Sequence, residues 1–194
     1  MWDERYSGHE YAYGKEPNDF LVKMQHYIPA GRVLCLAEGE GRNAVYLAKL
    51  GYEVTAVDSS TVGIDKTQRL ADENGVIVKS IIADLAEFDI GERQWEGIVS
   101  IFGHLPPPIR RKVHRDVVKG LKPGGYLILE AYTPEQLNYK TGGPPVAEMM
   151  MSLEGLEAEL DGLIFVHATE TVRPIHEGEF HHGEGAVVDI VAKR

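Results

Sequence analysis

The sequence has a single cysteine, no long apolar run and a shortage of basic residues. Cys35 alone cannot form an intrachain disulfide, and the amino-terminal stretch lacks the basic segment and apolar run of a secretory signal, so we expect a cytoplasmic protein. The longest apolar stretches, such as residues 126–131, are far shorter than the roughly 18 residues that suggest a membrane span. The 20 Lys and Arg against 30 Asp and Glu give a formal net charge of -10, which argues against nucleic acid and anionic membranes as partners.

The rest of the composition is that of an ordinary globular protein. Of the 194 residues, 43% are hydrophobic and 26% are charged, which supplies enough apolar material for one sizeable core. We therefore expect one domain over residues 1–194. Residues 1–28 carry several aromatic side chains and are expected to form either a lid that closes over a cationic ligand or a simple packing helix. The oligomeric state is not readable from the sequence.

Short apolar, β-branched runs alternate with amphipathic stretches along most of the chain. The runs lie at residues 32–37, 53–57, 76–83, 97–102 and 126–131. Such alternation is typical of an α/β fold with a parallel sheet and helices on both faces. Between the last two runs, apolar residues recur every four positions from Ile109 to Leu121, which predicts a helix that starts after the prolines at 106–108 and ends at residues 122–125.

The carboxyl-terminal part of the chain changes character. Apolar residues at helical spacing from Met149 to Leu163 predict one more helix. Residues 163–172 and 186–191 are expected to form strands joined by a polar, glycine-rich link at 177–185, and no helix is needed to join them. They are therefore predicted to be antiparallel, with residues 186–191 beside the fifth strand.

A glycine-rich loop, Ala37-Glu38-Gly39-Glu40-Gly41, follows the first predicted strand and opens a helix. Its spacing satisfies the dinucleotide fingerprint, so a nicotinamide dinucleotide and S-adenosylmethionine are both candidate ligands. The carboxylates of Glu38 and Glu40 would oppose a pyrophosphate but would favour an ammonium or sulfonium group. The loop therefore favours the cationic ligand.

Two aspartates close the next two predicted strands. Asp58 can accept hydrogen bonds from both ribose hydroxyls, because an ionised carboxylate offers two acceptor oxygens. Ser59 and Ser60 are expected to cap the following helix. Asp84 can accept from the exocyclic amine of adenine while Leu85 packs on the ring. Acidic positions at the carboxyl ends of the first three strands place a binding crevice where open α/β sheets bind their ligands.

These motifs, in this order, resemble the class I S-adenosylmethionine-dependent methyltransferases over nearly the whole chain. The motifs lie at residues 33–41, 57–58, 83–85, 98–105 and 121–125. Segments 2–6, 13–18 and 142–145 look like the tellurite-resistance and thiopurine methyltransferase-like branch of that class.

The resemblance implies a Rossmann-like fold with a mostly parallel seven-stranded sheet and an antiparallel last strand. It also implies S-adenosylmethionine as cofactor and a small-molecule methyl acceptor, such as a thiol or a tellurium or selenium oxyanion. Two residues depart from the pattern: Cys35 replaces the usual acidic residue of the first strand, and Ala37 replaces the first loop glycine.

The resemblance and the residues together define a candidate site. The expected cofactor contacts are Tyr6, Ala37, Glu38, Gly39, Gly41, Asn43, Asp58, Ser59, Asp84, Leu85 and Ile101. The expected acceptor contacts are Tyr13, Phe102 and Arg173. Residues 178–181 look like a segment that carries an acceptor-side histidine in the branch, so His181 is the preferred catalytic candidate, ahead of His104, which is either a base or a structural hydrogen bonder. Three histidines lie between residues 176 and 182, but their spacing predicts no structural metal site.

Two other functions remain open at this point. The first is a nicotinamide-dependent oxidoreductase that uses the same glycine loop, which Glu38, Glu40 and Asp84 disfavour. The second is a non-catalytic module that senses S-adenosylmethionine, or a metal through the histidine-rich link at 176–184. Binding without turnover would distinguish that module from an enzyme.

Overall fold

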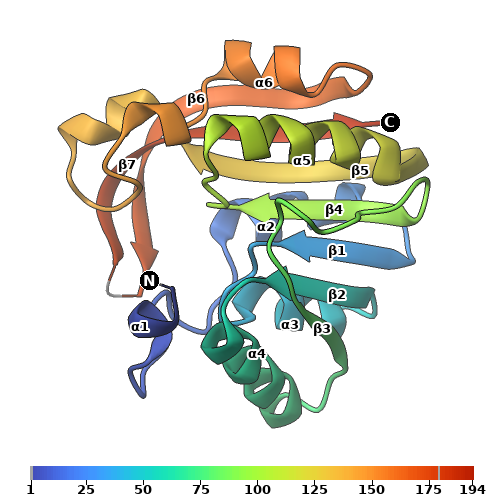
Figure 1. Ribbon diagram of the computed structural model, residues 1–194, viewed down its shortest axis with the longest axis vertical. Coiled ribbons are helices and arrows are strands. Elements are labelled where there is room, and N and C mark those ends of the chain that lie inside the picture. Colours follow the sequence, from blue (N-terminus) through green and yellow to red (C-terminus); the bar gives the residue numbers. More distant parts are fainter. Residues whose placement is uncertain (1, 179) are drawn as a thin grey trace.

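The computed structural model of the chain describes residues 2–178 and 180–194, which form a seven-stranded sheet with helices on both faces (Figure 1). The strand order is β3-β2-β1-β4-β5-β7-β6. The strands are β1 (Arg32–Leu36), β2 (Glu53–Asp58), β3 (Val78–Ile82), β4 (Trp95–Ile101), β5 (Leu121–Tyr132), β6 (Ile164–Glu177) and β7 (His181–Lys193). The first five pair in parallel, and β7 is antiparallel to both β5 and β6. The predicted fold class and the position of the last strand beside the fifth are confirmed.

The helices cover the two faces of this sheet. They are α1 (Trp2–Tyr6), α2 (Asp19–Met24), α3 (Arg42–Lys49), α4 (Thr61–Glu73), α5 (Pro107–Gly120) and α6 (Leu153–Glu159), with 3-10 turns η1 (Gln25–Tyr27), η2 (Pro134–Asn138) and η3 (Ala147–Met149). In Figure 1, α5 and α6 lie in front of the sheet and α2 lies behind it. No helix in the described part of the chain is long and apolar enough to cross a membrane.

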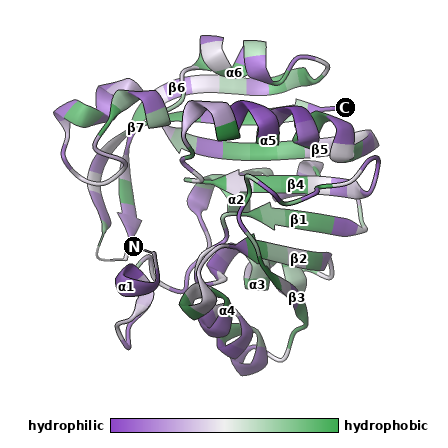
Figure 2. Cartoon of the chain, in the orientation of Figure 1, coloured by the Kyte–Doolittle hydropathy of each residue, from purple (hydrophilic) through white to green (hydrophobic). Residues whose placement is uncertain are grey.

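The alternation of side chains along each buried strand builds two hydrophobic cores. In β1, Leu34 and Leu36 pack with residues of α5 and α6, whereas Val33 and Cys35 pack with residues of α2, α3 and α4. Figure 2 shows the result as hydrophobic strands between helices whose outer sides are hydrophilic. Burial on both faces explains why the strands appear in the sequence as continuous apolar runs. Cys35 is fully buried, and burial raises the pKa of its thiol, so it acts as a small core residue.

Two carboxyl-terminal predictions are wrong in detail. The predicted helix from Met149 to Leu163 is interrupted, because the Met151 backbone N–H donates to the carbonyl of Tyr132 and Ser152 caps a new helix, α6. The predicted link at 177–185 is mostly strand, since β6 extends to Glu177 and β7 begins at His181. Glycine in this segment allows a neighbouring side chain to pack directly against the strand backbone. At Gly185 that side chain is Ile175, whose Cδ1 would lie only 2.4 Å from an added Cβ.

The glycine-rich segment at 122–125 also lies inside a strand. The sequence predicts that it ends the preceding helix, and α5 does end at Gly120. The segment then forms an irregularity within β5. Trp95 pairs with Leu121 and Gly97 pairs with Tyr126, so more residues of β5 than of β4 lie between the two pairs. The extra residues form a bulge at the end of the sheet away from the ligand crevice.

Ser60 links α4 to the amino-terminal segment. Its hydroxyl oxygen accepts from the Gly63 N–H at 3.0 Å as the helix cap, and it donates to Asp3 at 2.5 Å. We expect Ser60→Ala to lower the free energy of unfolding by about 1 kcal/mol, because the cap bond is lost. Urea denaturation measures this change. Ser59→Ala is the control, since the structure shows Ser59 exposed and only Ser60 as the cap, and an equal effect of the two variants would contradict the assignment.

Candidate active site

A cavity of about 410 Å³ lies at the carboxyl ends of β1, β2 and β4. Its other walls come from α1 and residues 13–14, from residues 143–149, and from His181 at the start of β7. In Figure 1, the β6–β7 hairpin curves past this edge of the sheet toward α1, so two segments far apart in the sequence come near each other. A second depression of about 320 Å³ between residues 87–92 and α5 contains none of the predicted site residues.

The glycine loop forms the cavity wall between β1 and α3. Gly41 has a φ of 92° and begins α3, and a Cβ at this position would lie 2.7 Å from the Thr67 Cα. Glycine is therefore required there by both conformation and space. Ala37, which stands where the family has its first glycine, has a φ of 50°. The substitution therefore keeps the left-handed backbone that the loop needs.

Asp58 and Asp84 line the cavity at the ends of β2 and β3. Asp58 Oδ2 accepts from the Gly39 N–H at 2.9 Å and Oδ1 accepts from the Ser60 N–H at 2.8 Å. Burial raises its pKa, an effect that these backbone hydrogen bonds oppose. Each carboxylate oxygen has a second lone pair for a ligand hydroxyl. Asp84 is exposed, and one of its oxygens accepts from the Ala86 N–H at 2.8 Å.

Glu38 and Glu40 have different roles, although the sequence suggests one role for both. Glu40 forms a buried ion pair with Lys66 at 2.7 Å and accepts from the Ala12 N–H, so its charge is already compensated. Glu38 accepts from the N–H groups of Asn43 and Ala44 at the start of α3 and has no cationic partner among the ion pairs of the described residues. Desolvation raises the pKa of Glu38 to about 7.

The other predicted cofactor residues also line the cavity. Tyr6 is buried, stacks on Trp2, and its hydroxyl lies 2.8 Å from where a Cβ of Gly39 would be. Asn43 holds the amino-terminal segment, because its side-chain oxygen accepts from the Asn18 N–H at 2.9 Å. The structure brings all the predicted cofactor residues except Gly41 to the cavity lining, namely Tyr6, Ala37, Glu38, Gly39, Asn43, Asp58, Ser59, Asp84, Leu85 and Ile101.

His181 lies on the opposite wall, in a box of aromatic rings. Its ring centroid is 4.5 Å from that of Tyr13, 4.7 Å from Phe102 and 5.3 Å from Tyr132. Burial lowers the pKa of His181, and the nearby Glu177 opposes this effect. His181 is therefore neutral at pH 7 and has a ring nitrogen that can accept a proton.

His104 also lines the cavity, but its hydrogen bonds favour the structural role. Its Nε2 accepts from the Tyr132 N–H at 3.0 Å, and desolvation, together with the nearby His181, lowers its pKa to about 3. The lone pair that a general base would use is engaged by the backbone. As a catalytic candidate, His104 is therefore set aside.

The structure does not bring Arg173 to the cavity. Its guanidinium donates two hydrogen bonds to Glu130, at 3.0 Å and 2.7 Å. Glu130 is fully buried in β5 and needs a compensating charge. The prediction that Arg173 contacts the acceptor is corrected for that reason.

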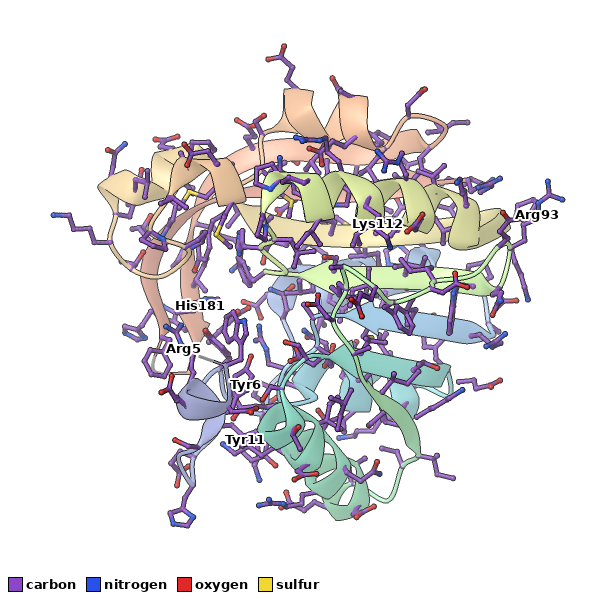
Figure 3. All side chains as sticks on the ribbon, viewed as in Figure 1. Arg5, Tyr6, Tyr11, Arg93, Lys112 and His181 are labelled. Atoms are coloured by element: carbon purple, nitrogen blue, oxygen red, sulfur yellow. The ribbon has the colours of Figure 1, made fainter. Side chains whose placement is uncertain are left out.

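Several cavity residues are not among the site residues predicted from the sequence. They are Trp2, Arg5, Gly14, Glu40, Arg42, Ala83, Gly103, Leu105, Gly143, Pro144, Pro145 and Met149. Arg5 donates to the Tyr13 hydroxyl at 3.0 Å, and its guanidinium lies 5.0 Å from the Phe180 ring centre. Figure 3 shows Arg5, Tyr6 and His181 at the same end of the molecule. The sequence signal for Arg5 is its place among the amino-terminal aromatic residues.

The histidine-rich turn shows only a pair of rings. His176 and His182 face each other across β6 and β7, with their Nδ1 atoms 3.3 Å apart. Glu179 lies outside the described residues. Within residues 2–178 and 180–194, no group of three or more His, Cys, Asp or Glu side chains could hold a metal ion.

Residues 33–125 match the family described as methyltransferase domain. That span contains the glycine loop, Asp58 and Asp84. The protein therefore contains a methyltransferase domain. The match to a methyltransferase domain favours S-adenosylmethionine over a nicotinamide dinucleotide as the cofactor. No curated protein sequence matches the chain.

Solved structures with the same fold include several methyltransferases. A structure from work on the conversion of a disulfide bond into a thioacetal group during echinomycin biosynthesis has 16% identity and a TM-score of 0.78, covering 99% of this chain and 87% of that one. TehB from Haemophilus influenzae has 19% identity and a TM-score of 0.75, covering 100% of this chain and 65% of that one. A TehB-like S-adenosylmethionine-dependent methyltransferase from Corynebacterium glutamicum has 19% identity and a TM-score of 0.66, covering 100% and 94%. At these identities the similarity shows the fold of the methyltransferase.

The cavity of the methyltransferase fits its cofactor chemically. Carboxylates of Glu38, Asp58 and Asp84 line one side, and they suit a ligand that carries hydroxyl, amine and sulfonium groups. Gly39 allows the Tyr6 hydroxyl to lie close to the loop backbone, since a Cβ at this position would be only 2.8 Å from it. Asp58 would hold the ribose, Asp84 and Leu85 the adenine, and Glu38 the cationic end.

We expect the affinity for S-adenosylmethionine to fall about tenfold as the pH drops from 8 to 6. With a pKa of about 7, Glu38 is mostly protonated at pH 6, and a cation in the cavity binds the ionised form more tightly. Binding therefore releases a proton, and the affinity levels off above pH 7. Calorimetry in buffers with different ionisation enthalpies measures the release. In Glu38→Gln the pH dependence should be lost, and equal slopes in both proteins would contradict this assignment.

Proposed function

We propose that this methyltransferase methylates a small molecule whose acceptor atom is soft, such as a thiol or a tellurium or selenium oxyanion. The acceptor binds between Tyr13, Phe102 and His181, opposite the carboxylates that hold the cofactor. The observation that carries this proposal is the enclosure of His181 in the cavity wall. A cavity of about 410 Å³ is within the usual range for small-molecule sites.

The two sides of the cavity differ in charge. Glu38, Asp58 and Asp84 make the cofactor side acidic, whereas Arg5 lies near the mouth on the side of Tyr13. A thiolate or an oxyanion is repelled by the first side and attracted by the second. The electrostatics therefore supports an acceptor that carries or develops negative charge.

The residues of the chain supply alignment, exclusion of water and a proton acceptor. When bound, S-adenosylmethionine supplies the methyl group: the acceptor lone pair forms the new bond to carbon while the carbon–sulfur bond breaks and sulfur keeps its electron pair. The aromatic box of Tyr13, Phe102 and Tyr132 restricts where the acceptor can lie. His181 takes the proton from an acceptor that arrives as a thiol or hydroxyl. An acceptor that is already ionised needs only alignment.

The similar structures agree with this choice of acceptor. Two of them carry the name TehB or TehB-like, and one comes from work on a disulfide that becomes a thioacetal. These names describe those proteins, and they support sulfur and tellurium compounds as the first acceptors to test.

An assay for S-adenosylhomocysteine release tests the proposal. The panel contains small thiols, tellurite, selenite and a phenol as the hard acceptor. We expect release with at least one soft acceptor and little with the phenol. Cofactor binding without release for any soft acceptor would overturn the proposal and would favour the non-catalytic binding module. A fluorescence titration with NADH serves as the negative control for the cofactor.

A further inference from the structure

A buried carboxylate, Glu177, lies directly behind His181. The two residues are paired in register across the β6–β7 hairpin, and both are 7% exposed. The distance between His181 Nδ1 and Glu177 Oε2 is 3.5 Å. Glu177 is not part of the cavity lining, whereas His181 is. The nitrogen Nδ1 therefore faces away from the acceptor, toward the carboxylate.

Glu177 is held from two further directions. Its Oε2 accepts from the Arg42 guanidinium at 2.7 Å, and its Oε1 accepts from the Asn18 side-chain amide at 2.8 Å. Burial opposes ionisation, but the hydrogen bonds from His181, Arg42 and Asn18 lower the pKa of Glu177 to about 2. The carboxylate is therefore ionised at neutral pH.

These two anchors come from two separate parts of the chain outside the hairpin. Arg42 is the first residue of α3, directly after Gly41 of the cofactor loop. Asn18 caps α2 and also donates from its side chain to Glu130, while its backbone N–H donates to Asn43. The position of Glu177 is thus fixed by the cofactor loop and by the amino-terminal segment, rather than by the hairpin alone.

A fixed carboxylate next to Nδ1 determines which ring nitrogen carries the proton. An ionised carboxylate can only accept, so the neutral ring places its proton on Nδ1. Nε2 then keeps its lone pair, and it has no hydrogen-bond partner among the described residues. The other charged groups that act on His181 are Arg42 and Glu130, and its aromatic neighbours are Tyr13, Phe102 and Tyr132.

We infer that Glu177 is a positioning residue that holds His181 in the Nδ1-protonated tautomer and so presents Nε2 as the base for a protonated acceptor. The inference rests on the proposed function, since it assigns how that same site moves a proton. The acceptor proton passes to Nε2, and Glu177 compensates the positive charge of the resulting imidazolium. The proton then leaves to solvent when the ring returns to its neutral form.

Nitrogen-15 NMR of the histidine side chains in the full chain tests the tautomer without any loss of fold. We expect His181 to be Nδ1-protonated at pH 8, with its signals assigned as those that disappear in His181→Ala. An Nε2-protonated ring in the wild type would overturn the inference. This measurement uses no acceptor, so it can fail while the proposed function stands, and the assay of S-adenosylhomocysteine release can fail while the tautomer is as expected.

The variant Glu177→Gln provides the kinetic test. We expect kcat for a thiol acceptor to fall at least tenfold with KM and S-adenosylmethionine affinity within about twofold, and the acid limb of the kcat/KM profile to move to lower pH, because the pKa of His181 falls further without the carboxylate. Glu177→Asp should recover part of the rate. A loss that is equal at all pH values, or full activity of Glu177→Gln, would overturn the inference.

Removing one charge from a buried pair can also impair folding, because Arg42 would be left without its partner. The double variant with Arg42→Gln and Glu177→Gln leaves no unpaired charge at this position and provides a second test that does not depend on the stability of the single variant. If Glu177 acts through His181, the acid limb should still move to lower pH, but by less than in the single variant, because the loss of Arg42 removes a charge that lowers the pKa of His181. An unshifted limb in a folded double variant would count against the role of Glu177.

Discussion

His181→Ala is expected to reduce turnover of a thiol acceptor about a hundredfold and to leave the affinity for S-adenosylmethionine nearly unchanged. General-base assistance contributes roughly this much when a proton must move in the transition state. His181 enters the cavity lining from the start of β7, whereas Glu38, Asp58 and Asp84 stand at the ends of β1, β2 and β3, so its loss leaves these carboxylates in place. Steady-state kinetics and calorimetry on the same protein samples separate the two effects.

The next residue of β7 provides a matched control. His182 is exposed on the other face of the strand, and His182→Ala should behave as the wild type. His104→Ala should instead lower stability, because it removes the acceptor for the Tyr132 N–H. Wild-type turnover in His181→Ala, with a thiol as acceptor, would show that alignment alone accounts for the chemistry.

The second large effect is expected at Asp58. Asp58→Ala should weaken S-adenosylmethionine binding roughly ten- to a hundredfold, since hydrogen bonds to a charged acceptor contribute about 1.5 to 3 kcal/mol. The carboxylate is positioned for this role by the backbone N–H groups of Gly39 and Ser60. Isothermal titration calorimetry gives the dissociation constant directly.

The variant also removes two internal hydrogen bonds, so a control for the local turn is needed. Asp89→Ala provides it, because Asp89 accepts from the Gly91 N–H in a similar turn outside the cavity. Its affinity for the cofactor should equal that of the wild type. If Asp58→Ala binds as tightly as Asp89→Ala, Asp58 is not a cofactor contact.

Local patterns in the sequence are sufficient to predict the parallel part of the sheet. Strands such as β1 are buried on both faces, so they form continuous apolar runs, and the acidic residues that follow them necessarily gather at one edge. The cavity lining by Asp58 and Asp84 follows from that geometry. The cofactor roles of these residues remain predictions until binding is measured.

The errors arise where long-range partners decide the role of a side chain. Glu40 and Glu38 are two residues apart in the same loop, yet Lys66 on α4 compensates only Glu40. The sequence predicts Arg173 as an acceptor contact, but Glu130, 43 residues away in the sequence, holds it. Glycines between 183 and 185 suggest a loop, whereas they permit Ile175 and Tyr132 to pack closely against β7. No local pattern reveals which distant charge or side chain will be the neighbour.

The insertion of β7 between β5 and β6 also determines when the cavity wall is completed during synthesis. β5 ends at Tyr132, but its partner β7 starts only at His181, after β6 has been made. Pairing across such a sequence separation is slow, because the intervening chain must close as a large loop before any contact stabilises it. A nascent chain that has emerged only as far as β5 can carry the glycine loop and Asp58, but it lacks His181 and its wall of the cavity. The glycine loop and Asp58 are therefore made well before β7, the strand whose His181 completes the cavity lining.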